Sequence, residues 1–367
     1  MYNYLFYDIF LFGRMIGELL EIDGSFGEGG GSILRLSAAY SILYNIPIKI
    51  FNIRANRPKP GLRLQHLLGL RALSELTGSK LSSCDVGTTE LTFIPGNKLK
   101  NNITLKVKTA ANIGLLLQPI QIACLKFKGA DEIRIRIDGG GTFGEWAPGL
   151  NYLKYITYEI FKKIGFFINL NIIKHGWYPK GGAKVECILK PPIKDLKPIN
   201  LTELGEISQI KGEILITNQI KGAHNISSRI KNSVISTIKK SFNINVNIKY
   251  NLVNSLSSGV SLLLWAKSDT GAIISSGTFL GRLKLSSESL GRMAANEILK
   301  YIKNDIPVDN YLSDQLIPIM AYTKEPSQIK VLDLTSHTKT NLELLKKFIN
   351  REYLIKKEKN YFIIEYK

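Results

Sequence analysis

The feature that most constrains the fold is a glycine-rich turn placed between a strand and a helix. In residues 22–35, five glycines surround one carboxylate, Glu28. The chain then continues into apolar residues, from Ile33 to Leu43, that recur every three or four positions. This spacing predicts a helix with a buried face that begins close to the glycines.

The same pattern returns later in the chain. Residues 135–145 again read as a strand ending in Ile-Asp-Gly, followed by Phe-Gly-Glu and a helical stretch over 147–164. A fainter echo at 276–279 precedes a long helix predicted over 283–303. Internal repeats of strand, glycine turn and helix predict an α/β (α+β) protein built from several similar units packed together.

The composition changes between Cys187 and about residue 278, where glycine-rich turns become rare. This segment reads as strand 213–216, helix 227–242, strand 245–250 and strand 260–267. We therefore predict a small α/β domain, residues 188–278, inserted into a larger repeat domain formed by residues 15–187 and 279–367.

The first fourteen residues are aromatic and apolar, but they are too short to span a bilayer and lack a small-residue cleavage site. We treat residues 1–14 as an appendage. Met15 precedes the first predicted strand, 19–22, so a translation start there is an alternative to a genuine extension.

The charge balance favours a polyanionic partner. Forty-nine basic and thirty acidic residues give a net charge of +19, which points to nucleic acid ahead of a membrane surface, although part of the surplus is dispersed lysine. Cys84, Cys124 and Cys187 are far apart and form no Cys-x-x-Cys pair. They are typical of reduced thiols in a cytosolic protein, with neither a disulfide framework nor a zinc site indicated.

The turn around Glu28 has the features of an anion site. Glycines allow positive φ and a close approach to free N–H groups at a helix start, where the helix dipole favours a phosphate. The spacing matches neither a Walker loop nor a dinucleotide fingerprint. Glu28 could hold a divalent metal beside the phosphates, and the alternative is a turn whose glycines serve backbone geometry alone.

A basic loop lies between the strand predicted over 46–53 and the next helix, which carries leucines on one face. Four cations crowd residues 54–63, and prolines stiffen the loop. Such a loop is suited to phosphates, although it could also be a solvated surface. His66, in the first turns of the helix, is as well explained by a structural role as by substrate contact.

Of the four histidines, His337 is the strongest candidate for a catalytic role. We place it in a polar loop between strand 329–334 and helix 342–349, where α/β proteins hold reactive groups. Taken alone, His337 is explained equally well by a surface position and by a catalytic role. The sequence offers no other nucleophile, because no cysteine or serine lies in a recognisable nucleophile turn.

The sequence resembles the RNA 3′-terminal phosphate cyclases over residues 19–350. The resemblance rests on motifs that occur in family order: residues 23–35, residues 53–62 with Gln65-His66, Leu117-Gln118, residues 175–179 with Gly181-Gly182, residues 311–315, and Ser336-His337 with Thr340-Asn341. It implies repeated units of a four-stranded sheet plus two helices, with a smaller inserted domain. It also implies a cytoplasmic RNA-processing enzyme of the ligase class that uses ATP to convert an RNA 3′-phosphate end to a 2′,3′-cyclic phosphate.

The resemblance also implies roles for individual residues. His337 falls on the adenylylated position, and Glu28 on the position of a divalent metal, Mg or Mn. Residues 109–112 and 142–146 depart from the family pattern, which leaves the adenine-side contacts open. The nucleotide and its phosphates are expected at Gln118, Tyr311, Leu312, Ser313, Asp314, Gln315, Arg35, Arg54, Arg57 and Arg63.

Two other classes of function remain open at this point. One is a cyclase-like ribosomal RNA processing factor that binds RNA without adenylylation, and the presence of His337 argues against it. The other is a relative of the enolpyruvyl transferases, which would share the repeats but would not need the motif at Ser336-His337 and Thr340-Asn341. The sequence does not indicate an oligomeric state.

Overall fold

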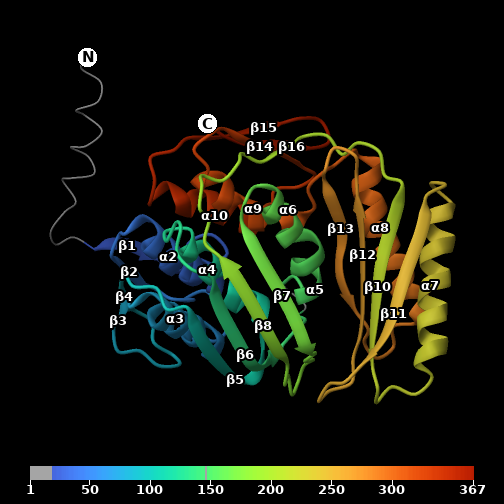
Figure 1. Ribbon diagram of the computed structural model, residues 1–367, viewed down its shortest axis with the longest axis horizontal. Coiled ribbons are helices and arrows are strands. Elements are labelled where there is room, and N and C mark those ends of the chain that lie inside the picture. The colour runs from blue at the N-terminus through green and yellow to red at the C-terminus, as the bar shows by residue number, and fades with distance from the viewer. Residues whose placement is uncertain (1–18, 145–146) are drawn as a thin grey trace.

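The structure is a computed structural model that describes residues 19–144 and 147–367 (Figure 1). The predicted appendage, residues 1–14, lies outside the described residues, as does Glu145 of the second glycine turn. The prediction of an α/β protein with repeated sheet and helix units is confirmed, because the described residues contain four mixed sheets of four strands each.

Three of the four sheets share one strand order. In each, the first two strands along the chain are parallel neighbours, the fourth pairs antiparallel with the second, and the third lies at the edge. In the first two of these units a helix follows each of the first two strands. In the first unit the sheet order is β1 (Leu20–Asp23), β2 (Ile48–Phe51), β4 (Leu91–Ile94) and β3 (Lys80–Leu81), with helices α2 (Gly31–Tyr44) and α3 (Leu64–Thr77).

The second unit repeats this arrangement with longer strands. Its second helical segment is interrupted by a π-helical turn, residues 153–157, labelled η1 (Leu153–Thr157). The sheet order is β5 (Asn102–Asn112), β6 (Ile133–Gly141), β8 (Lys184–Lys190) and β7 (Phe167–Lys174), and the helices are α4 (Ile113–Cys124), α5 (Leu150–Tyr152) and α6 (Tyr158–Lys163).

The third unit of this kind is divided along the chain. Its first strand, β9, has only two residues and is separated from the rest of its unit by about a hundred residues of other structure. The sheet order is β9 (Asn200–Leu201), β14 (Ser327–Val331), β16 (Phe362–Tyr366) and β15 (Tyr353–Lys357), with helices α9 (Asn310–Tyr322) and α10 (Ser336–Lys346).

The remaining sheet lies between β9 and α9 in the chain and forms the right-hand part of Figure 1. Its order is β11 (Asn245–Val253), β10 (Gln209–Thr217), β12 (Val260–Lys267) and β13 (Ile273–Leu280), and its helices are α7 (Ala223–Lys239) and α8 (Ser287–Lys303). The division into domains stays a prediction. The strand pairing assigns residues 200–201 to the third repeat, and α8 packs on α7, so the inserted sheet and its helices extend to residue 303.

The sequence echo between the two glycine turns does not follow the structural repeat. The first turn follows β1, the first strand of its sheet, whereas the second turn continues from β6, the second strand of its sheet. The echo at 276–279 lies within β13 of the inserted sheet. These sequence echoes therefore do not occupy equivalent positions in the sheets, although the prediction of repeated units is confirmed.

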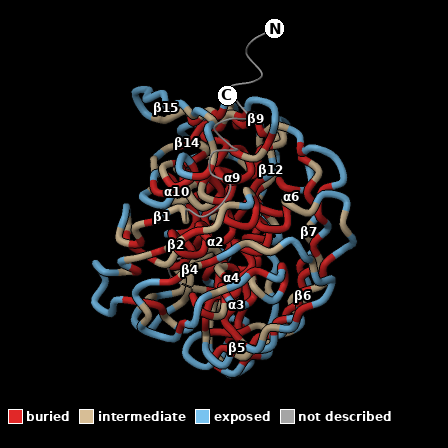
Figure 2. Tube along the Cα trace, turned by 90° about the vertical axis from the view of Figure 1, so that its left-hand side faces the viewer, coloured by how far each residue is buried: buried red, intermediate tan, exposed pale blue. Residues whose placement is uncertain are grey.

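The helices of the repeats lie inside and the sheets lie outside (Figure 2). Helix α2 is buried at every position from Ile33 to Leu43, because it contacts α3, α4, α10 and its own sheet. Each fully buried leucine or isoleucine contributes roughly 1.5–3 kcal/mol. The helix is therefore buried on all sides, whereas the sequence predicted a single buried face.

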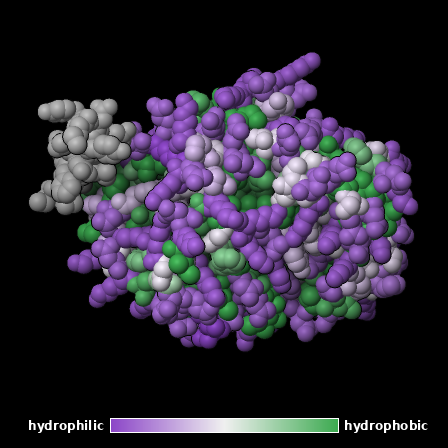
Figure 3. Space-filling view, turned by 45° about the horizontal axis from the view of Figure 1, so that its top comes forward, coloured by the Kyte–Doolittle hydropathy of each residue, from purple (hydrophilic) through white to green (hydrophobic). Residues whose placement is uncertain are grey.

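The face of the molecule in Figure 3 is largely hydrophilic, with hydrophobic residues scattered between hydrophilic ones. Among the residues that the structure describes, no helix is long and apolar enough to cross a membrane. The three cysteines are free and buried, in agreement with the predicted reduced thiols.

Candidate active site

The first glycine turn is fixed at its start by Asp23, the last residue of β1. Its Oδ1 accepts hydrogen bonds from the Ser25 amide at 2.9 Å and the Ser25 hydroxyl at 2.7 Å, which lower the pKa of Asp23. Gly27 and Gly29 then take φ values of 58° and 56°. Helix α2 follows without a side-chain cap at Gly30, so its first N–H groups have no side-chain acceptor. This is a helix terminus suited to an anion.

Glu28 and His337 meet beside this turn, although 309 residues separate them in the chain. Glu28 Oε1 lies 3.0 Å from His337 Nδ1, with the glutamate side chain 12% exposed and the histidine 45% exposed. The contact with Glu28 raises the pKa of His337, and burial opposes it. Because Nδ1 faces the carboxylate, Nε2 lies on the opposite side of the ring and is the nitrogen available for reaction.

His337 lies in the first turn of helix α10, and the prediction that it lies in a loop was wrong. The helix begins at Ser336 because Thr335 caps it, with Oγ1 accepting the Thr338 amide at 2.9 Å. The Thr338 hydroxyl also donates to Asp314 Oδ1 of α9 at 2.6 Å. These bonds position the histidine relative to α9.

Two further contacts hold α10 against its neighbours. The Tyr40 hydroxyl of α2 donates to Asn341 Oδ1, and Asn341 Nδ2 lies 3.4 Å from the Asp314 carbonyl oxygen. Burial raises the pKa of Asp314 to about 6, against the effect of its hydrogen bond from Thr338. The residues around His337 are thus tied to both α2 and α9.

Helix α9 has its own cap, which the sequence analysis missed. Asp309 is fully buried, and its Oδ1 accepts the amides of Tyr311 and Leu312 at 3.0 Å and the Tyr152 hydroxyl at 2.7 Å. Burial raises the pKa of Asp309 to about 7. An Asp directly before a predicted helix was the available signal.

The predicted nucleotide residues of α9 point in different directions. Tyr311 packs against Tyr152, and a side chain at Gly277 of β13 would collide with its ring. Leu312 lies in the core, and Ser313 Oγ donates to the Asn310 carbonyl. These two side chains support the helix, which leaves Tyr311 as a partly buried ring next to the inserted sheet.

A pair of glutamines connects α4 to α9. Gln121 Nε2 lies 3.5 Å from Gln315 Oε1, and both side chains are buried. Gln118 is buried one turn earlier on α4. The structure therefore brings the predicted Gln118 and Gln315 into the same helix pair.

Arg35 and His66 lie behind the glycine turn. Arg35 is 6% exposed, its Nε has no hydrogen-bond partner among the described residues, and burial lowers its pKa to about 10. His66 Nδ1 accepts the Arg63 amide at 3.2 Å, and the ring fills the space where a side chain at Gly31 would lie. Burial, together with the nearby Arg35, Arg54 and Arg63, lowers the pKa of His66 to about 3. It is a neutral histidine that packs against the start of α2, which favours the structural interpretation.

The predicted basic loop uses two of its arginines within the protein. Arg54 Nη1 donates to the Lys59 carbonyl at 2.8 Å and lies 3.2 Å from that of Gly61. Arg57 Nη2 donates to the Glu28 carbonyl at 2.8 Å and so holds the glycine turn from outside. The Arg63 guanidinium makes no hydrogen bond within the described part of the chain.

Glu28 fits a divalent cation in one respect. Its Oε1 is buried and has no partner of good hydrogen-bond geometry among the described residues, although His337 lies at ion-pair distance. No group of three or more His, Cys, Asp or Glu side chains among those residues could hold a metal by itself. One carboxylate with substrate phosphates is nevertheless a common way to bind Mg²⁺.

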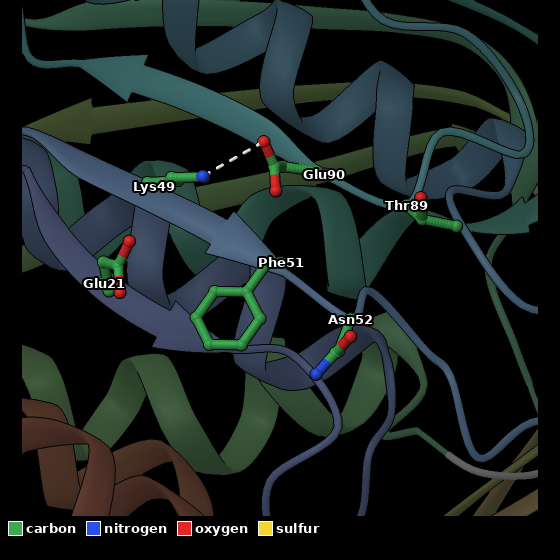
Figure 4. A pocket seen from close by; sticks show the side chains of 6 residues that line it. All are labelled: Glu21, Lys49, Phe51, Asn52, Thr89 and Glu90. Carbon is green, nitrogen blue, oxygen red and sulfur yellow. Dashed lines mark ion pairs between the residues drawn. The ribbon is translucent and has the colours of Figure 1, made fainter.

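One surface cavity lies away from this site. It has a volume of about 360 Å³ and is lined by residues that alternate with buried residues of β1 and β2, so it is on the outer face of the first sheet (Figure 4). Lys49 pairs with Glu90 across it at 3.2 Å. Its lining comprises Glu21, Lys49, Phe51, Asn52, Thr89 and Glu90, and none of these was predicted as a site residue.

An uncapped helix start, a buried arginine and a histidine oriented by a carboxylate form a site typical of phosphate chemistry. A family model described as RNA 3′-terminal phosphate cyclase matches residues 26–355, and the chain belongs to this family. It is 36% identical to an RNA 3′-terminal phosphate cyclase of Thermococcus kodakarensis over 93% of this chain and 96% of that protein. Proteins of the same description from Pyrococcus furiosus and Methanothermobacter thermautotrophicus are 36% and 32% identical, over 92% and 93% of this chain and 95% and 97% of their own.

Proposed function

We propose that this enzyme uses ATP to convert an RNA 3′-terminal phosphate to a 2′,3′-cyclic phosphate, through an adenylylated histidine and an adenylylated RNA end. This assigns it to the ligases that form phosphoric ester bonds. The observation that carries the proposal is the contact between His337 Nδ1 and Glu28, which directs Nε2 away from the carboxylate. The proposed partner is RNA with a 3′-phosphate end, and the proposed location is the cytoplasm.

In the first step, neutral His337 attacks the α-phosphorus of ATP through Nε2. A P–N bond forms as the bond to the pyrophosphate leaving group breaks. Glu28 stabilises the positive charge that develops on the ring, because its carboxylate already faces Nδ1. The histidine ring becomes a good leaving group from the resulting phosphoramidate once its other nitrogen, Nδ1, is protonated.

In the second step, an oxygen of the RNA 3′-phosphate attacks the adenylyl phosphorus, and the histidine leaves. The RNA end is then a diphosphate linked to adenosine. The neighbouring ribose 2′-hydroxyl attacks the RNA phosphorus, loses its proton, and expels AMP. One ATP is consumed to AMP and pyrophosphate for each ring closed.

Cationic and N–H groups of this chain meet the phosphate charge. We assign this role to the open start of α2 and to Arg35, whose buried Nε has no partner among the described residues. Arg63 is the least engaged arginine of the basic loop, while Arg54 and Arg57 also maintain its shape. A divalent metal, Mg or Mn, held by Glu28 would neutralise charge on the phosphate oxygens.

Helices α4 and α9 are the proposed base-side wall. Tyr311 offers a partly buried ring, and Gln118, Asp314 and Gln315 offer amide or carboxyl groups from the same helix pair. Leu312 and Ser313 contribute by fixing the helix. Two alternatives are an RNA-binding factor without adenylylation and a relative of the enolpyruvyl transferases. Neither gives a role to His337 in its contact with Glu28.

The test is incubation with α-labelled ATP and a divalent metal, followed by denaturation. We expect label bound to protein that is lost in acid and kept in alkali, since a phosphoramidate behaves in this way and a carboxylate anhydride does not. Addition of RNA with a 3′-phosphate should discharge the label, whereas RNA with a 3′-hydroxyl should not. Cyclisation without any protein-bound label would contradict the histidine intermediate.

A further inference from the structure

Four loop segments that are distant in sequence meet at one end of the inserted sheet. They are residues 174–180, 217–222, 252–259 and 281–284, here called the insert rim, at the lower edge of Figure 1. The Lys180 amide donates to Ser257 Oγ at 3.1 Å, and the Asn218 amide donates to the Val253 carbonyl at 3.1 Å. The Gly281 amide donates to the Val260 carbonyl at 2.9 Å. These bonds make the four segments one continuous surface.

The charge of the insert rim has one sign. Its segments contain no Asp or Glu, and none of their cations lies within ion-pair distance of a carboxylate among the described residues. Some cations elsewhere are paired, as Arg134 is with Glu186 and Arg229 with Glu288. Unpaired cations on neighbouring loops create a positive potential that attracts a polyanion. The rim cations are Lys174, Lys180, Lys221, Arg282 and Lys284.

Large aromatic and apolar side chains are exposed among these cations. Tyr178 is 83% exposed and Leu283 is 95% exposed, and Leu252 and Leu256 are more than half or half exposed. Exposed aromatic and apolar groups between cations are what a strand with unstacked bases requires. A surface that served only solubility would not need them.

The exposed tyrosine stands on a rigid base. Its neighbour Trp177 is buried and fills the space beside Gly259, and the Trp177 ring packs 4.7 Å from that of Phe143. The Phe143 ring in turn lies parallel to the His175 ring at 5.7 Å. This support holds the backbone at Tyr178, so an exposed ring there loses little conformational freedom when a base stacks on it.

The insert rim is also connected to the active site. Gly277 of β13 faces the Tyr311 ring, and Arg282 follows five residues later along the same strand direction. Five extended residues span at most about 17 Å. A short RNA strand whose end is bound at the active site can therefore reach the insert rim.

We propose that the insert rim binds the single-stranded body of the RNA substrate, upstream of its 3′ end, with a base stacked on Tyr178 and phosphates on the rim cations. The proposal rests on the proposed function for the identity of the strand. It adds a second site that the reaction chemistry does not need but that favours longer RNA over a free dinucleotide.

The experiment compares a dinucleotide and a strand of about 12 nucleotides, both with a 3′-phosphate, in binding and in cyclisation. Tyr178→Ala should weaken binding of the longer strand about 5- to 100-fold, the effect of losing one stacked base. Arg282→Ala with Lys284→Ala should reduce the log–log salt slope by about 1.4, for two phosphate contacts on a single strand.

The matched control is Lys239→Ala, an exposed cation at the opposite end of α7 from Lys221. It should leave both substrates unchanged, and the rim variants should cyclise the dinucleotide at the wild-type rate. Equal losses on both lengths, or no loss on the longer strand, would overturn the proposal, as would binding of lipid vesicles or protein in place of RNA. Protein–AMP formation is measured in parallel, so failure of the proposed function is seen separately from failure of the rim.

Discussion

The two glycine-rich turns, residues 24–31 and 139–144, begin alike in sequence and end in different surroundings. In the first, side chains from other elements approach the glycines: Thr340 of α10 at Gly27 and His66 of α3 at Gly31. In the second, Gly139 approaches the Val107 carbonyl, and a side chain at Gly140 would lie 2.8 Å from Ile113 Cγ1 of α4 and 3.1 Å from the Ala111 carbonyl oxygen. The first turn is therefore approached by a hydroxyl and an imidazole, whereas Gly139 and Gly140 are approached by backbone carbonyls and an apolar side chain where β6 runs beside β5.

The difference follows from the position of each turn in its repeat. The first turn precedes the first helix of its unit, where α10 and α3 converge on the helix start. The second turn still belongs to β6, so its glycines allow two strands and the loop after β7 to come close. A glycine pattern therefore predicts a tight backbone, whereas the elements packed around it decide whether a ligand can enter.

The largest expected effect concerns His337, which lies beside the first turn. His337→Ala should abolish protein-bound AMP and reduce cyclisation by more than about 1,000-fold. RNA binding should remain, because the proposed phosphate contacts come from other residues. His224→Ala, at an exposed position on α7, is the matched control and should keep full activity. A His337→Ala enzyme that still acquires acid-labile AMP would refute the assignment.

The second prediction compares the turns directly. Gly27→Ala should cost about 1–3 kcal/mol of stability, because φ is 58° and the new methyl meets Thr340. It should also lower adenylylation roughly 100-fold per folded molecule, because a displacement of α10 moves the nucleophile. Gly140→Ala, with φ of 83°, should cost similar stability but keep activity per folded molecule.

Thermal unfolding and active-site titration with labelled ATP separate these two outcomes. Thr340→Ala combined with Gly27→Ala removes one of the colliding groups and should restore part of the lost activity. Equal loss of activity per folded molecule in the two glycine variants would mean that the contrast between the turns is not functional.

Sequence reasoning predicted individual helices and strands better than it predicted which repeat each belongs to. The leucines at 67, 70, 73 and 76 correctly indicated α3, and strand 260–267 has the same bounds as β12. The third repeat was missed because β9 has two residues and gives no periodic signal, and because the inserted sheet separates it from α9. A pattern that is local in sequence cannot report a pairing made across such an insertion.

Sequence reasoning named candidate residues but not how they meet. Glu28 and His337 were both identified, but their 3.0 Å contact depends on α10 packing against α2, and no local pattern contains it. The roles of Arg54 and Arg57 in holding their own loop and the glycine turn likewise depend on tertiary geometry. Buried Asp309 and Tyr152 were missed. Their hydrogen bond joins positions that are 157 residues apart in the chain, and no local sequence pattern indicates such a bond.

The third prediction concerns the charge in the first turn. Glu28→Gln keeps the shape of the side chain and removes its charge, so the metal concentration needed for adenylylation should rise. The thermal midpoint should change little at a pH well above the raised pKa of His337, where the ring is neutral, and the contact is also partly exposed. Metal titrations that overlay those of the wild type would reduce Glu28 to a turn residue.

The same variant has a second, pH-dependent consequence. Because Glu28 raises the pKa of His337 above its ordinary value of 6.5, the folded protein binds this proton more tightly than the unfolded chain does. The stability from the contact is fully present below 6.5 and is lost as pH rises through the folded pKa. Glu28→Gln should therefore lower the thermal midpoint at acidic pH and not at alkaline pH, and a uniform shift would contradict this reading.

The smallest expected effect separates two arginines beside the first turn. Arg63→Ala removes a guanidinium that makes no hydrogen bond within the described residues, so folding should be unaffected. If Arg63 contacts one RNA phosphate, the log–log salt slope of RNA binding should fall by about 0.7. Arg57→Ala should show the same change in slope together with a lower thermal midpoint, because its guanidinium also holds the Glu28 carbonyl. Arg57→Lys keeps the charge but loses the fork geometry, so it should restore the slope and not the midpoint. An unchanged slope in Arg63→Ala, with normal turnover, would remove this arginine from the site and leave the start of α2 and Arg35 as the phosphate contacts of the first turn.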